Sequence, residues 1–153
     1  MNVKKIAREQ QIRLVNETAQ HLKTLKLPPK GWLATVRNAL GMSQAQLSKR
    51  RNIKRNQVSK LELTEMNGSV TLGTMKKMSE AMGCRFVYAV IPDRNIQELI
   101  WDQAVLKASK IANRASAHMD LENQSLTKNQ LTDDIRQQAK KLVENQPRDL
   151  WDD

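Results

Sequence analysis

The stretch SQAQLSKRRNIKRNQVSKLE, at residues 43–62, constrains the fold most tightly because it carries the start signals of a short helix. Ser43 and Gln46 have the spacing of a capping box, in which each side chain bonds the backbone N–H of the other residue. Met42 and Leu47 flank this box with the spacing of a hydrophobic staple. Two neighbouring signals therefore predict that a helix begins at Ser43.

A tight turn and a second short helix follow within the same stretch. Asn52 is one of the few residue types that tolerate the left-handed conformation needed by a short turn between helices. The next helix is predicted over about 54–64, with Val58 and Leu61 facing the core. Two short helices joined in this way are typical of the helix-turn-helix motif of DNA-binding proteins.

The rest of the chain is mainly helical in its periodicity, and its five Gly and four Pro residues favour long helices over a sandwich or barrel. The further helices are expected over 2–26, over 31–40, between Thr71 and Gly83, from about Ile96 to Met119, and from a second capping box at Thr127-x-x-Gln130. We therefore predict a mainly α fold with an N-terminal helix (1–27), a helix-turn-helix domain (31–83), a short strand (84–92) and a C-terminal helical extension (93–153).

The strand is predicted from CRFVYAVIP at residues 84–92, where β-branched and aromatic residues dominate and Pro92 ends the run. A lone strand needs a partner for its backbone donors and acceptors. No second strand is apparent in the sequence, so we expect this strand to pair with the same strand of a second copy. The predicted homodimer contacts come from Phe86, Val87, Tyr88 and Val90.

Charge is distributed unevenly along the chain, whose formal net charge is +10. Residues 1–92 contain 17 Lys/Arg and 5 Asp/Glu, whereas residues 93–153 contain 9 Lys/Arg and 11 Asp/Glu. A domain this basic usually binds a polyanion, with nucleic acid as the first choice and an anionic membrane surface as the second. The sequence has no apolar run long enough to span a membrane, no secretory h-region and a single cysteine, Cys84, so a cytoplasmic location is expected.

The predicted DNA contacts lie in the two central helices. Arg and Lys suit guanine edges in the major groove, Asn and Gln suit adenine, and further basic side chains suit phosphates. The candidate DNA-binding residues are Gln44, Lys49, Arg51, Lys54, Arg55, Asn56, Gln57, Ser59 and Lys60. Catalysis is not expected, because the sequence has no Gly-rich phosphate loop and no Cys/His cluster with metal-ligand spacing. No cofactor and no metal are predicted.

A family resemblance agrees with this interpretation. The pattern GMSQAQLSKR…VSKLE…TLGTMKKMSEAMG makes residues 31–83 resemble the Xre/Cro-type helix-turn-helix domain, which implies five short helices with the third reading DNA. GWLATVRNALGMSQAQLSKR, GCRFVYAVIP, HMDLENQ and LWDD together resemble the mobile mystery protein A family, over nearly the full chain. That resemblance implies a neighbouring Fic-domain protein as partner, and the strand is similar to the strand with which HipB-like antitoxins pair across a two-fold axis.

One departure from the family pattern leaves open where the reading helix starts and which side chain is the first to read a base. Lys54 stands where a Ser or Thr commonly caps the reading helix, so its start is open by one or two residues.

The expected function is a sequence-specific, dimeric repressor that binds an inverted repeat and regulates its own operon. The alternative is an antitoxin that binds a Fic-type toxin directly. No glutamate completes the Ser/Thr-x-x-x-Glu-Gly/Asn inhibitory motif, so inhibition by that glutamate is not expected.

Overall fold

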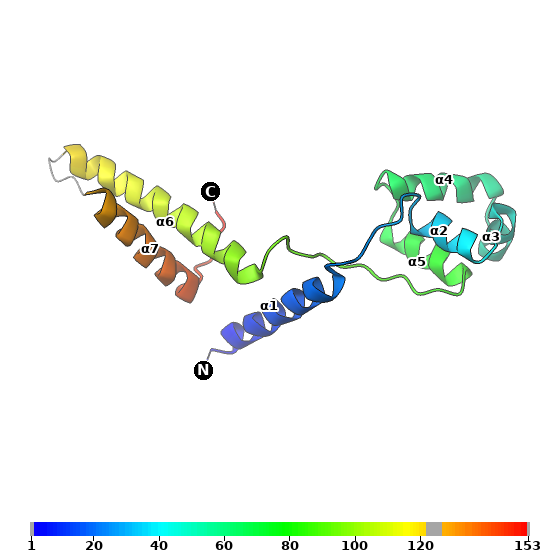
Figure 1. Ribbon diagram of the computed structural model, residues 1–153, viewed down its shortest axis with the longest axis horizontal. Helices are drawn as coiled ribbons and strands as arrows, with labels where there is room; N and C mark the ends of the chain where they lie inside the picture. The colour runs from blue at the N-terminus through cyan, green and yellow to red at the C-terminus, as the bar shows by residue number, and fades with distance from the viewer. Residues whose placement is uncertain (1, 122–126, 153) are drawn as a thin grey trace. The chain divides into compact units, whose positions relative to one another are not determined.

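The computed structural model describes residues 2–121 and 127–152 of the chain. Their regular structure consists of α1 (Val3–Leu22), α2 (Trp32–Ala39), α3 (Gln44–Arg51), α4 (Arg55–Met66), α5 (Leu72–Ala81), α6 (Ile96–Leu121) and α7 (Lys128–Asn145) (Figure 1). Two compact units are present: a central unit, Lys23–Val90, and a flanking unit formed by Met1–Leu22 and Ile91–Asp153. The predicted mainly α class is confirmed for the described residues.

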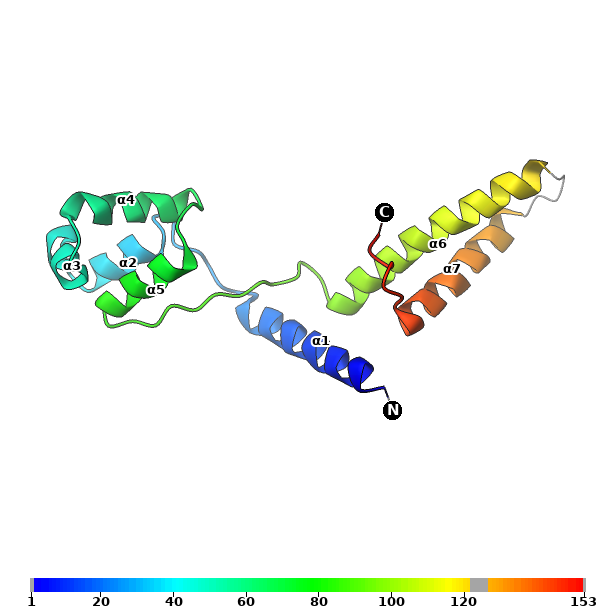
Figure 2. The same ribbon diagram turned by 180° about the vertical axis from the view of Figure 1, so that it is seen from behind.

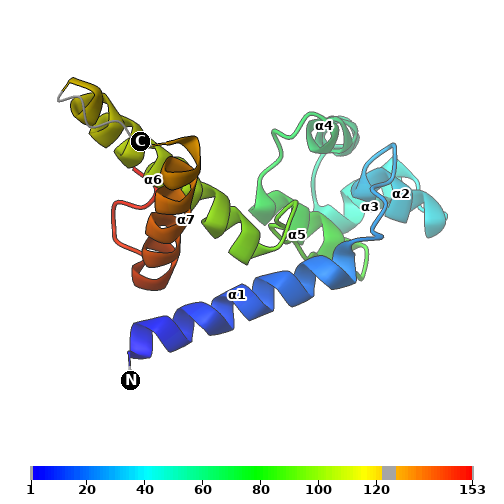
Figure 3. The same cartoon turned by 60° about the vertical axis from the view of Figure 1, so that its left-hand side comes forward.

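The core of the central unit is aliphatic and rich in methionine. Each of its helices contributes at least one fully buried side chain, namely Leu33 of α2, Leu47 of α3, Val58 of α4 and Met78 of α5. Met75 and Met82 join them, and Leu61 packs partly against the cluster. Burial of such side chains stabilises a fold by about 1.5–3 kcal/mol each. This core holds α3 and α4 in place, and α4 is seen end-on in Figure 3.

Local signals set the helix starts as the sequence predicts. The hydroxyl of Thr71 accepts a hydrogen bond from the backbone N–H of Thr74, at 3.1 Å, and begins α5. The hydroxyl of Thr127 accepts one from the backbone N–H of Gln130, at 3.3 Å, and begins α7. Leu126 lies outside the described residues, as do residues 122–124 of the HMDLENQ motif and the side chain of Met119.

The number of helices in the central unit differs from the resemblance. The family pattern implies five short helices, whereas Lys23–Val90 contains four, α2 to α5. After α5 the chain turns at Gly83, whose φ of 73° is left-handed, and then enters the β-branched run that Pro92 ends. A segment of this composition has low helix propensity, so no fifth helix forms. The reading helix is still the third of the unit.

The described residues of the single chain contain no β-strand, so residues 84–92 are unpaired here and their predicted pairing with a second copy stays a prediction. These residues are non-helical and run as an open connection out of α5 (Figure 1). A strand is defined by ladder hydrogen bonds, and no other described segment pairs with this one. Phe86 packs partly against the core of the central unit. The residues that follow it are exposed.

In the flanking unit, α6 and α7 pack side by side as a helical hairpin, and the chain after α7 turns back along α6 (Figure 2). Ala104 and Ala108 of α6 and Ala139 of α7 are fully buried, which allows the two backbones to approach closely. Lys107 contacts Asp149 at 2.8 Å, and this cation lowers the pKa of the Asp149 carboxyl. Among the described helices, none is long and apolar enough to cross a membrane.

Candidate nucleic-acid interface

The helix-turn-helix begins with a complete capping box. The hydroxyl of Ser43 accepts a hydrogen bond from the backbone N–H of Gln46, at 3.1 Å. The side-chain oxygen of Gln46 accepts one from the backbone N–H of Ser43, at 2.8 Å. Both predicted halves of the box are therefore present, and α3 starts at the next residue, Gln44.

The turn between α3 and α4 is formed by Asn52 in the left-handed conformation, with φ 56° and ψ 47°. Its backbone N–H bonds the carbonyl of Lys49 at 3.1 Å, and the N–H of Ile53 bonds the carbonyl of Ser48 at 2.9 Å. These bonds satisfy carbonyl groups that the end of a helix would otherwise leave unpaired. Ser48 is buried, and its hydroxyl donates to the carbonyl of Ala45 at 2.8 Å.

The structure defines the start of α4, the helix predicted to read DNA. Lys54 is its N-cap, with an extended backbone at φ −74° and ψ 149°, and Arg55 is its first residue. The side-chain oxygen of Gln57 accepts a hydrogen bond from the backbone N–H of Lys54, at 2.8 Å. A lysine side chain has no acceptor, so the reciprocal bond to the first turn of α4 is not made. The N-terminus of α4 therefore keeps backbone donors that suit an anion.

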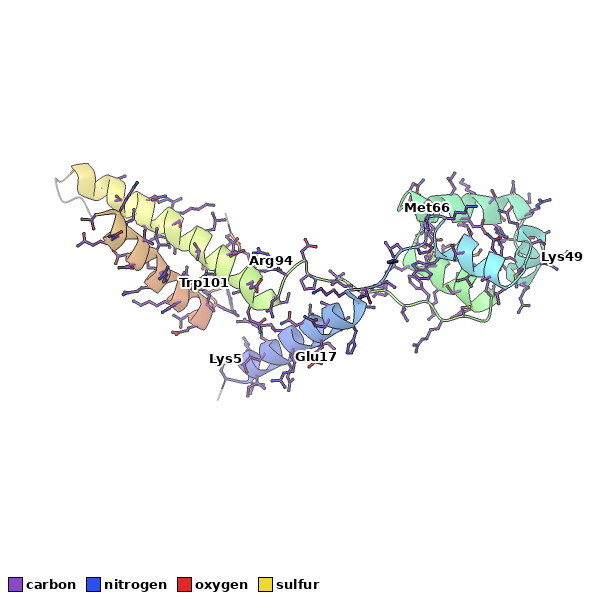
Figure 4. All side chains as sticks on the ribbon, viewed as in Figure 1. Lys5, Glu17, Lys49, Met66, Arg94 and Trp101 are labelled. Carbon is purple, nitrogen blue, oxygen red and sulfur yellow. The ribbon has the colours of Figure 1, made fainter. Side chains whose placement is uncertain are left out.

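Most of the predicted DNA-contacting side chains are on the surface. The exposed ones are Lys49, Lys54, Arg55, Asn56, Gln57, Ser59 and Lys60. Because α4 turns once every 3.6 residues, Asn56, Ser59 and Lys60 share one face away from the buried Val58, and Arg55, three residues before Val58, lies at the edge of this exposed face. Lys49 lies on the neighbouring helix α3 and is labelled in Figure 4.

Gln44 and Arg51 are half-buried and differ from the exposed set. The side-chain nitrogen of Gln44 donates to a carboxylate oxygen of Glu62, at 3.0 Å, so this amide also supports the fold. The Nε atom of Arg51 is buried and has no hydrogen-bond partner within the described part of the chain. Arg50, which was not a candidate, donates from Nε to the carbonyl of Ala81 at 2.8 Å and thereby ties α3 to α5.

A buried ion pair fixes α4 against α2. The Nε atom of Arg37 lies 2.5 Å from one carboxylate oxygen of Glu62, and its Nη2 lies 3.1 Å from the other. The same guanidinium donates to the carbonyl of Met42 at 2.9 Å. This bidentate geometry is the strongest form of an ion pair between side chains. The role of Arg37 was not predicted, because its partner lies in another helix.

A second carboxylate from α4 caps α2. Glu65 accepts hydrogen bonds from the backbone N–H groups of Trp32, at 2.6 Å, and Leu33, at 2.9 Å. Gly31 precedes them with φ 79°, and a Cβ atom there would lie 2.9 Å from the Glu65 carboxylate. Only glycine allows the carboxylate to approach this closely.

The charge of the central unit is strongly one-sided. Lys23–Val90 contains 13 Lys/Arg and 3 Asp/Glu. Two of the three acids, Glu62 and Glu65, are engaged in the contacts just described. Little negative charge therefore opposes the basic side chains around α3 and α4, which favours association with a polyanion.

The arrangement of possible metal ligands can be read from the described residues. No group of three or more His, Cys, Asp or Glu side chains within them is placed to hold a metal ion. His21 is in the last turn of α1 and His118 is in the last turn of α6, and both are exposed.

Comparison with known proteins agrees with this geometry. A family model described as helix-turn-helix matches residues 33–88. No curated protein and no solved structure matches the chain. The match covers α2 to α5, so this region is a helix-turn-helix domain of the Xre/Cro type, a DNA-binding module of transcriptional regulators.

Proposed function

We propose that the protein is a dimeric, sequence-specific transcriptional repressor that reads an inverted-repeat operator with α4. One observation carries this proposal: Arg55, Asn56, Ser59 and Lys60 share an exposed face of the third helix of a helix-turn-helix domain. The buried Val58 and the ion pair of Glu62 with Arg37 hold α4 against the rest of the central unit. A helix that is fixed on one side and polar on the other suits insertion into the major groove.

The reading face has side chains for both direct and electrostatic recognition. Arg55 and Lys60 can donate to the O6 and N7 atoms of guanine, and Asn56 can form a bidentate pair with adenine. Lys49 and Lys54 are placed on either side of the turn, where they can contact phosphates together with the first backbone N–H groups of α4. Base contacts would specify the sequence, and phosphate contacts would set the register.

The segment after α5 supplies the proposed dimer interface. Val87, Tyr88 and Val90 are 68%, 71% and 88% exposed, which is costly for three large apolar side chains in one short segment. The rings of Phe86 and Tyr88 stack with centroids 6.1 Å apart, as residues on one side of an extended chain can do. Pairing of this segment with its copy would cover these side chains and satisfy the backbone.

A two-fold dimer predicts the form of the operator. Two copies of α4 would meet successive major grooves, so the half-sites should lie about one helical turn apart, ~34–36 Å. The resemblance to the mobile mystery protein A family adds the proposal that the regulated operon also encodes a Fic-domain protein. Direct binding to that protein, through α6 and α7, is the alternative function.

Binding to DNA at two salt concentrations tests this function. The full-length protein would be titrated onto the region upstream of its own gene and onto scrambled DNA, at ~50 mM and ~200 mM salt. We expect tight binding to a palindrome in the upstream region at both salts, whereas binding to scrambled DNA collapses at the higher one. Equally weak binding to both DNAs would refute a specific repressor and favour direct binding to a protein partner.

Arg55→Ala should reduce operator affinity by about 1–3 kcal/mol and relax the preference at one base position, because a bidentate base contact is lost. Lys49→Ala is the matched control, since it removes one exposed cation from the neighbouring helix. Lys49→Ala should weaken binding to all sequences alike. It should also reduce the steepness with which the logarithm of the affinity falls against the logarithm of the salt concentration by about one. Both effects can be measured by competition binding with single-base operator variants, and wild-type behaviour of both variants would mean that the reading face is wrong.

A further inference from the structure

The flanking unit contains a cavity of about 450 Å³ that DNA binding does not use. Three segments that are distant in the sequence line it: α1, the first turns of α6 and the chain after α7. Its apolar lining comes from Ile12, Val15, Ile96, Ile100, Leu150 and Trp151. The volume falls within the range of small-molecule sites, ~300–1,000 Å³.

Polar contacts hold α1 at both ends of this cavity. At one end, the side-chain oxygen of Asn16 accepts a hydrogen bond from the backbone N–H of Ile96, at 3.0 Å, and its nitrogen donates to the side chain of Gln97 at 2.8 Å. At the other end, Arg8 donates to the side-chain oxygen of Gln146. Between these contacts α1 buries no side chain fully, so its apolar residues leave the cavity open.

The charge of the lining has one sign. Arg8 and Arg148 both line the cavity, and none of the lining residues is acidic. Within the described residues, the guanidinium of Arg148 has no hydrogen-bond or ion-pair partner. An apolar chamber with an unpaired guanidinium at its wall matches a ligand that has an apolar body and one anionic group.

We propose that this cavity binds a small amphipathic anion, such as a carboxylate with an aliphatic body. The body would lie against the isoleucines, Leu150 and Trp151, where apolar surface is removed from water. The carboxylate would face Arg148, since guanidinium groups bind carboxylates through paired hydrogen bonds. This site is separate from the helix-turn-helix domain and does not depend on the function proposed for it.

Probes that differ only in head-group charge test the site. Octanoate, octan-1-ol and octylammonium would each be titrated into the full-length protein, with backbone amide NMR shifts as the readout. We expect octanoate to give saturable shifts at residues 8–16, 96–100 and 146–151, and to bind more tightly than the other two probes. Equal binding of all three, or shifts that do not saturate, would overturn the proposal.

Variants separate the charge contact from the cavity itself. Arg148→Gln should weaken octanoate binding about tenfold, through loss of a charged hydrogen bond, and leave octan-1-ol binding unchanged. Arg13→Gln is the matched control, because Arg13 is an exposed arginine of α1 that does not line the cavity. Ile12→Trp should fill the space and abolish binding of octanoate.

A second copy of the chain is the competing occupant. If it covered the cavity, dilution of the protein without any probe would shift the same amides, and octanoate would compete with self-association. That result would also overturn the proposal. DNA binding can be measured on the same samples, so failure of the ligand site and failure of the repressor function are distinguishable.

Discussion

Aspartate at both Val87 and Tyr88 should convert the proposed dimer into a monomer. These side chains are 68% and 71% exposed in the single chain, and the proposed pairing buries them against a second copy. Two carboxylates on each copy would then face each other at close range, which opposes pairing. Sedimentation equilibrium would report the change in mass.

The same double substitution should lower operator affinity by roughly a hundredfold or more, because a monomer binds each half-site without the high effective concentration supplied by its partner. Leu63→Asp is a matched control, since Leu63 of α4 is 66% exposed and lies outside the segment after α5. It should leave the dimer intact. Persistence of the dimer after the double substitution would instead place the interface in the helices of the flanking unit.

Glu62→Ala should reduce the free energy of unfolding of the central unit by about 3–5 kcal/mol, because it leaves the Arg37 charge without its partner in a largely buried place. Both side chains of this pair are 11% exposed. The substitution also removes the acceptor of the Gln44 amide. Urea unfolding followed by circular dichroism would measure the loss.

Two further variants make this result specific. Asp102→Ala breaks the ion pair between Arg94 and Asp102, whose side chains are 54% and 51% exposed. This substitution should reduce the free energy of unfolding by less than about 1 kcal/mol. Replacing both partners, by Arg37→Met with Glu62→Leu, should recover most of the stability, since apolar side chains of similar volume need no charge partner. If Glu62→Ala reduced the free energy of unfolding no more than Asp102→Ala does, the Arg37–Glu62 ion pair would not be what holds α4 in place.

The helix-turn-helix was predictable because its signals are local. The capping box of Ser43 and Gln46 acts over three residues, and Asn52 needs only its own backbone freedom to make the turn. Val58 follows from helical periodicity. The same holds for Thr71 and Thr127, each of which accepts a bond from a residue three positions later. The positions of the reading face follow directly once the helix start is known.

Contacts between distant segments were not predictable in this way. Asn16 binds the first backbone N–H of α6, 80 positions away, and Glu65 caps α2 from the far end of α4. The predicted strand depends on contacts of another kind. Val87 and Tyr88 have strand propensity, but a strand also needs a paired neighbour, and no described segment of the single chain supplies one, so pairing with a second copy stays a prediction.

The amino-acid sequence by itself determined the helices, their caps, the turn at Asn52 and the excess of positive charge, because these depend on residues within one turn of each other or on composition alone. Tertiary structure decided which charges are free to meet DNA and which are used inside the fold, as with Arg37 and Glu62. It also grouped α1 with α6 and α7, and so formed the cavity beside Arg148. Such pairings depend on the packing of whole helices, which brings together side chains that no local pattern relates.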